Sequence, residues 1–452
     1  MKLLLVSWEY PPVVVGGLGR HVHNLAVALA ELGHDVVVLT RRPTGTDATT
    51  HPTTVTTAEG VRIIAAAEDP PEFDFGSDMM PWTLAMGHAM VRAGLRVLRD
   101  DGTGQAWIPD VVHAHDWLVA HPAVALAEFY DVPLVATIHA TEAGRHSGWV
   151  AAKTNRQVHS VEWWLAREAD ALITCSTSMR DEVNRLFGPE LAEIQVIHNG
   201  IAVEEWPHRR LEESGTVPSD GPAELLFAGR LEYEKGVQDL LAALPRIRRT
   251  HPGTTLTIAG SGTQLEWLLE LARKHRVVGA VTFRGSVDRA ELIELMHRSA
   301  AIVLPSRYEP FGIVALEAAA TGVPLVVSTA GGLGEAVTDT HTGMTFPPAD
   351  VTALAAAVRT TLDDPEAAAQ RARRAFGVHP LDQLGVLAHR QHAVIQINQL
   401  PTTKRLQTQA QEVSPLAQRT TLHVLHADRR DGICRIAGHI SVAGAAKADV
   451  RV

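Results

Sequence analysis

Short apolar runs alternate with amphipathic segments along most of the chain, and this alternation is the feature that most restricts the fold. In the first 40 residues, a strand over 2–8 precedes a loop over 10–19, a helix that Gly33 ends, and a second strand over 36–39. Buried strands that alternate with helices are typical of a parallel sheet covered on both faces. The sequence therefore predicts an α/β protein built from doubly wound parallel sheets.

The alternation occurs in two blocks, and a segment rich in Pro, Gly and Ser separates them. We expect a first domain over 1–206, a linker over 207–222, a second domain over 223–375 and a tail over 376–452. The first domain should hold further strands and helices, the strands at 61–66, 110–113, 133–138, 171–175 and 194–197 and the helices at 82–99, 117–129, 155–169 and 178–187. The second should hold strands at 224–228, 254–259, 280–284, 301–304 and 324–327 and helices at 236–249, 263–275, 288–299, 312–320 and 351–362. Two such sheets place a ligand in the cleft between them, at the carboxyl ends of the strands.

The tail differs from the rest in composition. From Phe376 onward it has no Trp and no Tyr, Gln is frequent, and helical periodicity is poor. One hypothesis is that 376–452 arises from a shifted reading frame or a divergent end, and the alternative is a poorly patterned native helix. Sequencing the encoding DNA across this junction separates the two.

Composition excludes several classes of protein. The net charge of −10 argues against bulk nucleic-acid binding. The two cysteines, Cys175 and Cys434, have no metal-ligand spacing and suit a reducing compartment. There is no signal peptide pattern, no run of about 18 apolar residues and no basic amphipathic helix. We expect a cytoplasmic protein with at most peripheral membrane contact.

The most informative motif follows the apolar run 301–304. A short polar loop carries Glu309, and Pro310-Phe311-Gly312 opens a helix in which Glu317 lies about two turns in. Backbone N–H groups around Gly312 and Ile313 suit an anion, and Glu317 can reach back toward the loop. A carboxylate for a sugar hydroxyl beside amides for a phosphate is what a nucleotide sugar requires. The alternative is an ordinary turn with two solvated carboxylates.

Glycines and cations at two other strand ends suggest a diphosphate site. Gly16 and Gly17 lie between the first strand and helix, where backbone can approach a phosphate, although a plain turn is the alternative. The loop does not have the Gly-x-Gly-x-x-Gly pattern, so NAD binding is disfavoured. Arg230 and Lys235 follow strand 224–228 and should point into the cleft, where fixed cations stabilise a departing nucleoside diphosphate. No metal is then required, and a solvated basic turn is the alternative.

Histidines and acids end two strands of the first domain. His139 closes strand 133–138 and faces the expected cleft, with Glu142 and Arg145 shortly after it. The run His113-Ala114-His115-Asp116 ends another strand. It lacks a third firm metal ligand, so a polar wall of the cleft is favoured over a metal site, with Asp116 capping the next helix.

Three further turns of the second domain should lie near the nucleotide. Gly262 and Arg284 belong to strand-to-helix turns that would flank the base and ribose through backbone contacts, and the turn 331–335 should line the cleft. Each of these signals is weak by itself.

Taken in order over about 370 residues, these motifs resemble the retaining glycosyltransferases of family 4, which have the GT-B fold, on the side nearest glycogen and starch synthases. The runs that carry the resemblance are Glu9-Tyr10-Pro11-Pro12, Gly16-Gly17, His113 to Trp117, His139, Arg230 with Lys235, and Glu309 with Glu317. Residues 1–375 also resemble actinobacterial, especially mycobacterial, α-(1→4)-glucosyltransferases of 6-O-methylglucose lipopolysaccharide and glycogen synthesis.

The resemblance implies roles for these residues. It implies an acceptor-side first domain, with Glu9, His115, Asp116, Glu142 and Arg145 on the acceptor side, and a second domain that binds the nucleotide sugar. Catalysis would involve His139, Arg230, Lys235 and Glu309, without a metal or another cofactor. The donor-binding residues would be Gly16, Gly17, Arg230, Lys235, Gly262, Arg284, Glu309, Phe311, Gly312, Ile313 and Glu317.

The expected partners are a nucleotide sugar and an α-1,4-glucan acceptor. Related bacterial glycogen synthases carry Lys-Thr-Gly-Gly-Leu at the first loop, and this chain has Val14-Val15-Gly16-Gly17-Leu18. The missing lysine favours UDP-glucose over ADP-glucose. Three alternatives stay open: a GDP-mannose-dependent lipid mannosyltransferase, a nucleotide-sugar epimerase and an inactive glucan-binding protein.

Overall fold

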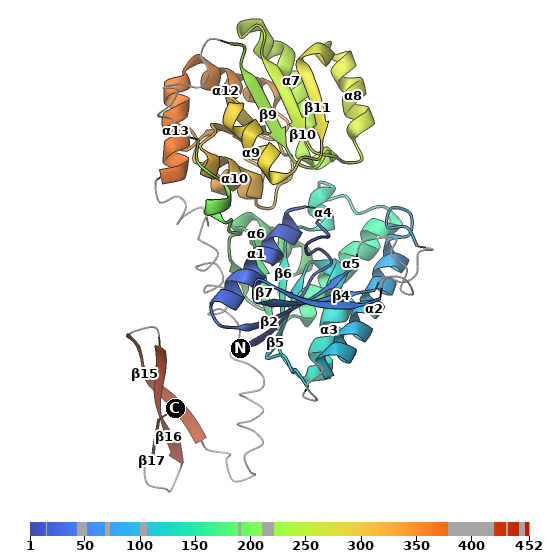
Figure 1. Ribbon diagram of the computed structural model, residues 1–452, viewed down its shortest axis with the longest axis vertical. Coiled ribbons are helices and arrows are strands. Elements are labelled where there is room, and N and C mark those ends of the chain that lie inside the picture. Colours follow the sequence, from blue (N-terminus) through green and yellow to red (C-terminus); the bar gives the residue numbers. More distant parts are fainter. Residues whose placement is uncertain are drawn as a thin grey trace. The chain divides into compact units, whose positions relative to one another are not determined.

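The computed structural model describes residues 1–14, 16–42, 52–67, 73–99, 106–188, 191–209, 221–377, 420–430, 433–442 and 448–451. Residues up to Gly377 belong to one compact unit, and the strands after Thr420 belong to another. The first unit contains two α/β domains (Figure 1). Most of the linker expected at 207–222, and residues 378–419 of the tail, lie outside the described residues.

The first domain is built on an eight-stranded sheet in the order β3-β4-β2-β1-β5-β6-β7-β8. All pairings are parallel except that of β3 with β4, which is antiparallel. The strands are β1 (Lys2–Val6), β2 (Asp35–Arg41), β3 (Thr54–Ala58), β4 (Val61–Ala66), β5 (Val111–His115), β6 (Leu134–Ile138), β7 (Ala171–Thr174) and β8 (Ile194–Val196). The helices are α1 (Gly17–Glu31), α2 (Met79–Arg99), η1 (Trp117–Val119), α3 (Ala120–Tyr130), α4 (Glu142–Arg145), α5 (Lys153–Glu168), α6 (Thr177–Phe187) and η2 (Val203–Glu205).

The second domain has a six-stranded parallel sheet in the order β11-β10-β9-β12-β13-β14. Its strands are β9 (Glu224–Ala228), β10 (Thr255–Ala259), β11 (Val281–Gly285), β12 (Ala301–Leu304), β13 (Leu325–Ser328) and β14 (Met344–Phe346). Its helices are η3 (Tyr233–Lys235), α7 (Val237–Thr250), α8 (Leu265–Lys274), η4 (Val278–Ala280), α9 (Arg289–Arg298), α10 (Ile313–Thr321), α11 (Gly332–Ala336), α12 (Val351–Asp363) and α13 (Pro365–Gly377). The predicted fold class, two doubly wound parallel sheets, is therefore confirmed.

Both sheets bury almost every residue of their central strands, which explains the apolar sequences of these strands. The side chains of β1, β9 and β12 pack into cores between the sheet and helices on its two faces, as Leu4, Phe227 and Ile302 illustrate. Each sheet reverses its strand order beside its first strand, since β1 pairs with both β2 and β5, and β9 pairs with both β10 and β12. Loops that leave strands at such a switch point diverge and leave room for a ligand.

The tail forms a second unit with a different architecture. Its described residues make a three-stranded antiparallel sheet of β15 (Thr420–Arg430), β16 (Ile433–Val442) and β17 (Ala448–Arg451). The poor helical periodicity noted in this segment agrees with strands. Whether the tail is a native end or a shifted frame stays a prediction.

No helix within the described ranges has both the length and the apolar character needed to cross a membrane.

Candidate functional site

A cavity of about 940 Å³ lies between the two domains of the first unit. Its walls are the loops that leave the carboxyl ends of β1, β5 and β6 in one domain and of β9 and β12 in the other. Most residues predicted for the site line it: Glu9, Gly16, Gly17, Asp116, His139, Glu142, Arg145, Arg230, Lys235, Glu309, Phe311, Gly312, Ile313 and Glu317.

Three predicted residues are not among those that line the cavity. His115 lies behind His139 and is fully buried. Gly262 packs so closely on the backbone of Leu231 that a Cβ atom there would lie 2.4 Å from its carbonyl oxygen. Arg284 is half-exposed and forms an ion pair with Glu291. The donor roles expected for Gly262 and Arg284 stay predictions. In the structure, Gly262 contacts Leu231 and Arg284 contacts Glu291.

Lys235 and Glu309 form the centre of the second domain's side of the cavity. Lys235 Nζ lies 2.7 Å from Glu309 Oε2, and Ser306 donates to the same carboxylate. Both side chains are mostly buried, so this ion pair has little water to screen it. The loops that carry Lys235 and Glu309 can approach each other because Gly236, with φ +73°, packs against the backbone of Pro305. A Cβ atom on Gly236 would lie 1.8 Å from the Pro305 carbonyl oxygen. Only glycine fits this position.

Arg230 is the second cation on this side. Its Nη2 lies 3.1 Å from Glu234 Oε1, and its side chain lines the cavity and is 41% exposed. Both cations are therefore held by carboxylates while remaining at the cavity wall, which is the placement expected for groups that meet an anionic ligand.

Glu317 is buried in α10, and its partner comes from the other domain. Arg20, in the first turn of α1, places Nη1 2.6 Å from Glu317 Oε1. Burial raises the pKa of Glu317, and the charge of Arg20 acts in the opposite direction. Sequence reasoning did not find Arg20, although it follows the glycine loop directly.

The glycine loop at the start of α1 is shaped by Glu9. The N–H groups of Gly16 and Gly19 donate to Glu9 Oε2 over 2.9 and 3.4 Å. Gly17 faces Ile313 of α10, where a Cβ atom would lie 3.1 Å from the isoleucine side chain. The carboxylate of Glu9, expected on the acceptor side, thus also holds this loop in place.

Histidines and a buried ion cluster form the first domain's wall. Burial lowers the pKa of His139 to about 3, so its imidazole is neutral at physiological pH. Asp116 accepts a hydrogen bond of 2.7 Å from the His139 backbone N–H. The expectation that Asp116 caps the next helix was wrong, because its side chain makes no cap hydrogen bond to η1 and is used by the β6 loop.

Arg145 is half-buried and lies near several acidic groups. Burial opposes its charge, but Asp116, Tyr308, Glu162 and Glu142 together raise its pKa. Burial also raises the pKa of Asp116 to about 6 and that of Glu162 to about 8, although Arg145 acts against both shifts. This wall is therefore a charged network whose members depend on one another.

A second set of contacts joins the domains beside the cavity, and the sequence did not reveal it. Tyr308 donates to Glu182 Oε1 over 2.8 Å and accepts from the Thr141 N–H over 3.2 Å. Ser176 donates to the carbonyl of Pro310, and Glu335 accepts from the N–H groups of Thr177 and Ser178 at the start of α6. The turn 331–335, expected to line the cleft, instead borders a separate pocket of about 680 Å³ through Gly331 and Glu335.

Two family models match the two domains of the first unit. The model of Glycosyltransferase Family 4 matches residues 15–205, and that of Glycosyl transferases group 1 matches residues 210–377. The chain is 67% identical over 375 residues to the glycogen synthase of Mycobacterium tuberculosis H37Rv, which covers 83% of this chain and 89% of that protein. The chain belongs to glycosyltransferase family 4. This family 4 glycosyltransferase is a homologue of glycogen synthase, and the expected resemblance is confirmed.

Other relatives of the family 4 glycosyltransferase are more distant. The D-inositol 3-phosphate glycosyltransferase of Kineococcus radiotolerans is 30% identical over 393 residues, covering 80% of this chain and 87% of that protein. Among solved structures, a sucrose-phosphate synthase from Thermosynechococcus elongatus has a TM-score of 0.71 at 23% identity and covers 92% of this chain and 100% of that one. Anabaena HepE in complex with UDP and glucose has a TM-score of 0.66 at 18% identity and covers 88% of this chain and 100% of that one. These structures confirm the GT-B fold.

Proposed function

We propose that this family 4 glycosyltransferase moves glucose from a nucleotide donor to the non-reducing end of an α-1,4-glucan and retains the configuration of the anomeric carbon. The observation that carries the proposal is the convergence of Arg230, Lys235, Glu309 and Glu317 of one domain and His139 of the other on one cavity. The 67% identity to a glycogen synthase supports glucose as the sugar. A lipopolysaccharide glucan and glycogen are both acceptors of this chemistry.

The donor diphosphate would meet the cations and the first turn of α10. Arg230 and Lys235 would turn from their carboxylate partners toward the phosphates, and the N–H groups after Gly312 would add the positive end of a helix. Glu317 would accept hydrogen bonds from the ribose. UDP-glucose is our favoured donor because Val14 stands where related synthases have lysine.

Leaving-group stabilisation is the main catalytic effect that we propose. Negative charge develops on the diphosphate oxygen as the glycosidic bond breaks, and fixed cations at that oxygen stabilise the transition state more than the ground state. His139, neutral at physiological pH, would accept a hydrogen bond from the glucose, and Glu309 would hold another hydroxyl. The acceptor hydroxyl then attacks from the face that the diphosphate leaves, so that no covalent enzyme intermediate is needed.

The acceptor would bind against the first domain. Asp116, Glu142 and Arg145 line that wall, and carboxylate and guanidinium groups are suited to sugar hydroxyls. The cytoplasm is the proposed setting, since its reducing conditions suit a chain with two cysteines and no disulfide framework.

Nucleotide release tests the proposal. The purified protein would be mixed with UDP-glucose, ADP-glucose or GDP-mannose, each with and without a maltooligosaccharide, and with D-inositol 3-phosphate as a separate acceptor. We expect acceptor-dependent release from a glucose nucleotide and a longer oligosaccharide as product. Release only with GDP-mannose or only with inositol phosphate would refute glucan elongation. Tight maltooligosaccharide binding without release would favour a binding protein.

A further inference from the structure

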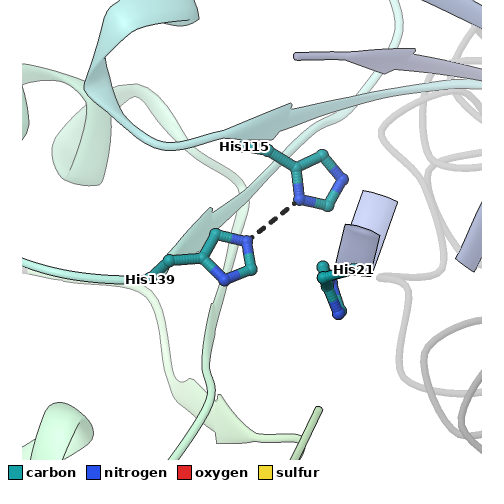
Figure 2. A group of neighbouring side chains, drawn as sticks. All are labelled: His21, His115 and His139. Carbon is teal, nitrogen blue, oxygen red and sulfur yellow. Dashed lines mark hydrogen bonds between the residues drawn. The ribbon is translucent and has the colours of Figure 1, made fainter. Parts of the chain in front are cut away.

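Three histidines from three different elements gather at the inner wall of the cavity. His115 ends β5, His139 follows β6 directly, and His21 lies in the second turn of α1. Figure 2 shows their rings around a common space, with the hydrogen bond between His115 and His139 as a dashed line. The ligand nitrogens all lie within 4.8 Å of one another. Within the described ranges, this is the one group of three or more His, Cys, Asp or Glu side chains with such convergence.

The spacing of these nitrogens is close to that of a metal site. Zn²⁺ binds imidazole nitrogens at about 2.0–2.1 Å, so two such ligands of a tetrahedral ion lie about 3.4 Å apart. His115 Nδ1 and His139 Nε2 are already 3.2 Å apart. The His21 ring, whose centroid is 4.9 Å from that of His139, supplies the third imidazole of the set.

The cavity connects this group of histidines to solvent, and carboxylates near them favour a cation. His21 and His139 line the cavity together with Glu9 and Asp116, so an ion can arrive from the donor and acceptor side. His113 packs against His115 with ring centroids 4.2 Å apart and bonds to Thr137, which fixes the position of the deepest ligand.

We propose that His21, His115 and His139 form a binding site for a late first-row divalent cation, Zn²⁺ above all, and that the bound cation blocks sugar transfer. Imidazole ligands and a tetrahedral arrangement with one open position select such ions over Mg²⁺ and Ca²⁺, which prefer oxygen. The inhibition rests on the proposed function, because the cation would engage His139, which would otherwise bind the donor glucose. The binding itself does not rest on it.

Cobalt absorption tests the site without substrate. Co²⁺ would be titrated into untagged protein stripped with a chelator, because Co²⁺ in a tetrahedral nitrogen site has intense visible d–d absorption and reports the ligand set. We expect a band that saturates at one equivalent and is displaced by Zn²⁺. The variant His21→Gln should weaken binding by at least about 10-fold. His88→Gln, at an exposed position on α2, is the matched control and should bind like the wild type.

Turnover tests the inhibition. We expect Zn²⁺ to suppress nucleotide release, EDTA to restore it, and His21→Gln to need at least about 10-fold more Zn²⁺ for the same fractional loss. A failure to saturate with Co²⁺, or equal binding by wild type and His21→Gln, would overturn the site. A saturable band with unchanged turnover in Zn²⁺ would overturn the inhibition. Because the absorption needs no turnover, an enzyme inactive with every donor would refute the proposed function without affecting the test of the site.

Discussion

The hydroxyl of Tyr308 lies 2.8 Å from Oε1 of Glu182, and this hydrogen bond joins the loop after β12 to helix α6 of the other domain. The phenol is half-buried, and Glu182 also accepts a hydrogen bond from the Thr141 hydroxyl. The contact lies next to Glu309, so it links the position of a proposed sugar-binding residue to closure of the two domains.

Removal of this hydroxyl should weaken the closed state. A hydrogen bond to a charged group contributes about 1.5–3 kcal/mol, so Tyr308→Phe should lower kcat/KM for the donor by about 10-fold or more. Steady-state kinetics of nucleotide release would measure this. Tyr130→Phe is the control, because the described residues offer its buried hydroxyl no hydrogen-bond partner and it lies at the end of α3.

A backbone variant tests the same contact independently. A Cβ atom on Gly144 would lie 2.3 Å from the Tyr308 ring, so Gly144→Ala should displace the ring and produce a similar loss. Gly279→Ala should leave the kinetics unchanged, because its Cβ atom would meet no atom within 4 Å in the part of the chain that the structure describes. Wild-type kinetics in both Tyr308→Phe and Gly144→Ala would show that this contact does not control closure.

The charge of Arg20 should control the pH dependence of donor binding. Without it, the pKa of the buried Glu317 rises further, and the carboxylate is protonated at higher pH. For Arg20→Gln, we therefore expect a donor KM that begins to increase at a higher pH than in the wild type as the pH falls. Arg20→Lys keeps the charge and should recover most of the wild-type profile. Parallel profiles for all three proteins would contradict the role of Arg20.

The ammonium group of Lys235 should act on the chemical step. Lys235→Ala removes a cation from the departing diphosphate and should lower kcat by on the order of 100-fold, with a smaller change in KM. Single-turnover measurement of UDP release would separate chemistry from product release. Lys274→Ala, at an exposed site in the last turn of α8, is the control. Near-normal turnover of Lys235→Ala would remove this residue from the proposed mechanism.

Glu162 should make the folded state less stable as the pH rises. Its pKa is raised from 4.5 to about 8 by burial, so the folded protein binds a proton between these values that the unfolded chain has lost. Stability from Glu162 is thus fully present below about pH 4.5 and lost as the pH rises to about 8.

The variant Glu162→Gln does not undergo this loss. Its stability relative to the wild type should improve across the same pH range by at least ~1 kcal/mol, or about 2–4 °C in Tm. Thermal unfolding at several pH values measures the difference. Glu168→Gln, exposed on the same helix, should show no such trend. A pH-independent difference for Glu162→Gln would contradict the raised pKa.

The fold was predictable from sequence where apolar runs were long and buried on both sides. Strands β9 and β12 have the predicted bounds because nothing polar interrupts them. Strand β3 was missed because Thr54–Ala58 is polar and mostly exposed. It lies at the edge of the sheet and pairs with one strand only, β4. Helix α13 was missed because the small apolar surface of its alanines gives a weak periodic signal.

The site was predictable only in part, for a different reason. Glu309, Lys235 and His139 follow the carboxyl ends of strands. In a parallel sheet these ends lie along one edge, so the position of such residues can be predicted from the strands alone. The partner of Glu317 is 297 residues away in the sequence, and no local pattern connects the two. Tyr308 was likewise visible in its motif, but its contact with Glu182 depends on how the two domains meet.

The carboxylate of Glu335 has a consequence for each catalytic cycle. It occupies the first amides of α6, where the helix dipole would otherwise attract an anion from solution. Opening of the cavity to release product would break these two exposed hydrogen bonds. Phosphate or sulfate ions in the buffer could then occupy the exposed helix end and delay reclosure. The composition and ionic strength of the medium should therefore affect the turnover rate even where they leave the chemical step untouched.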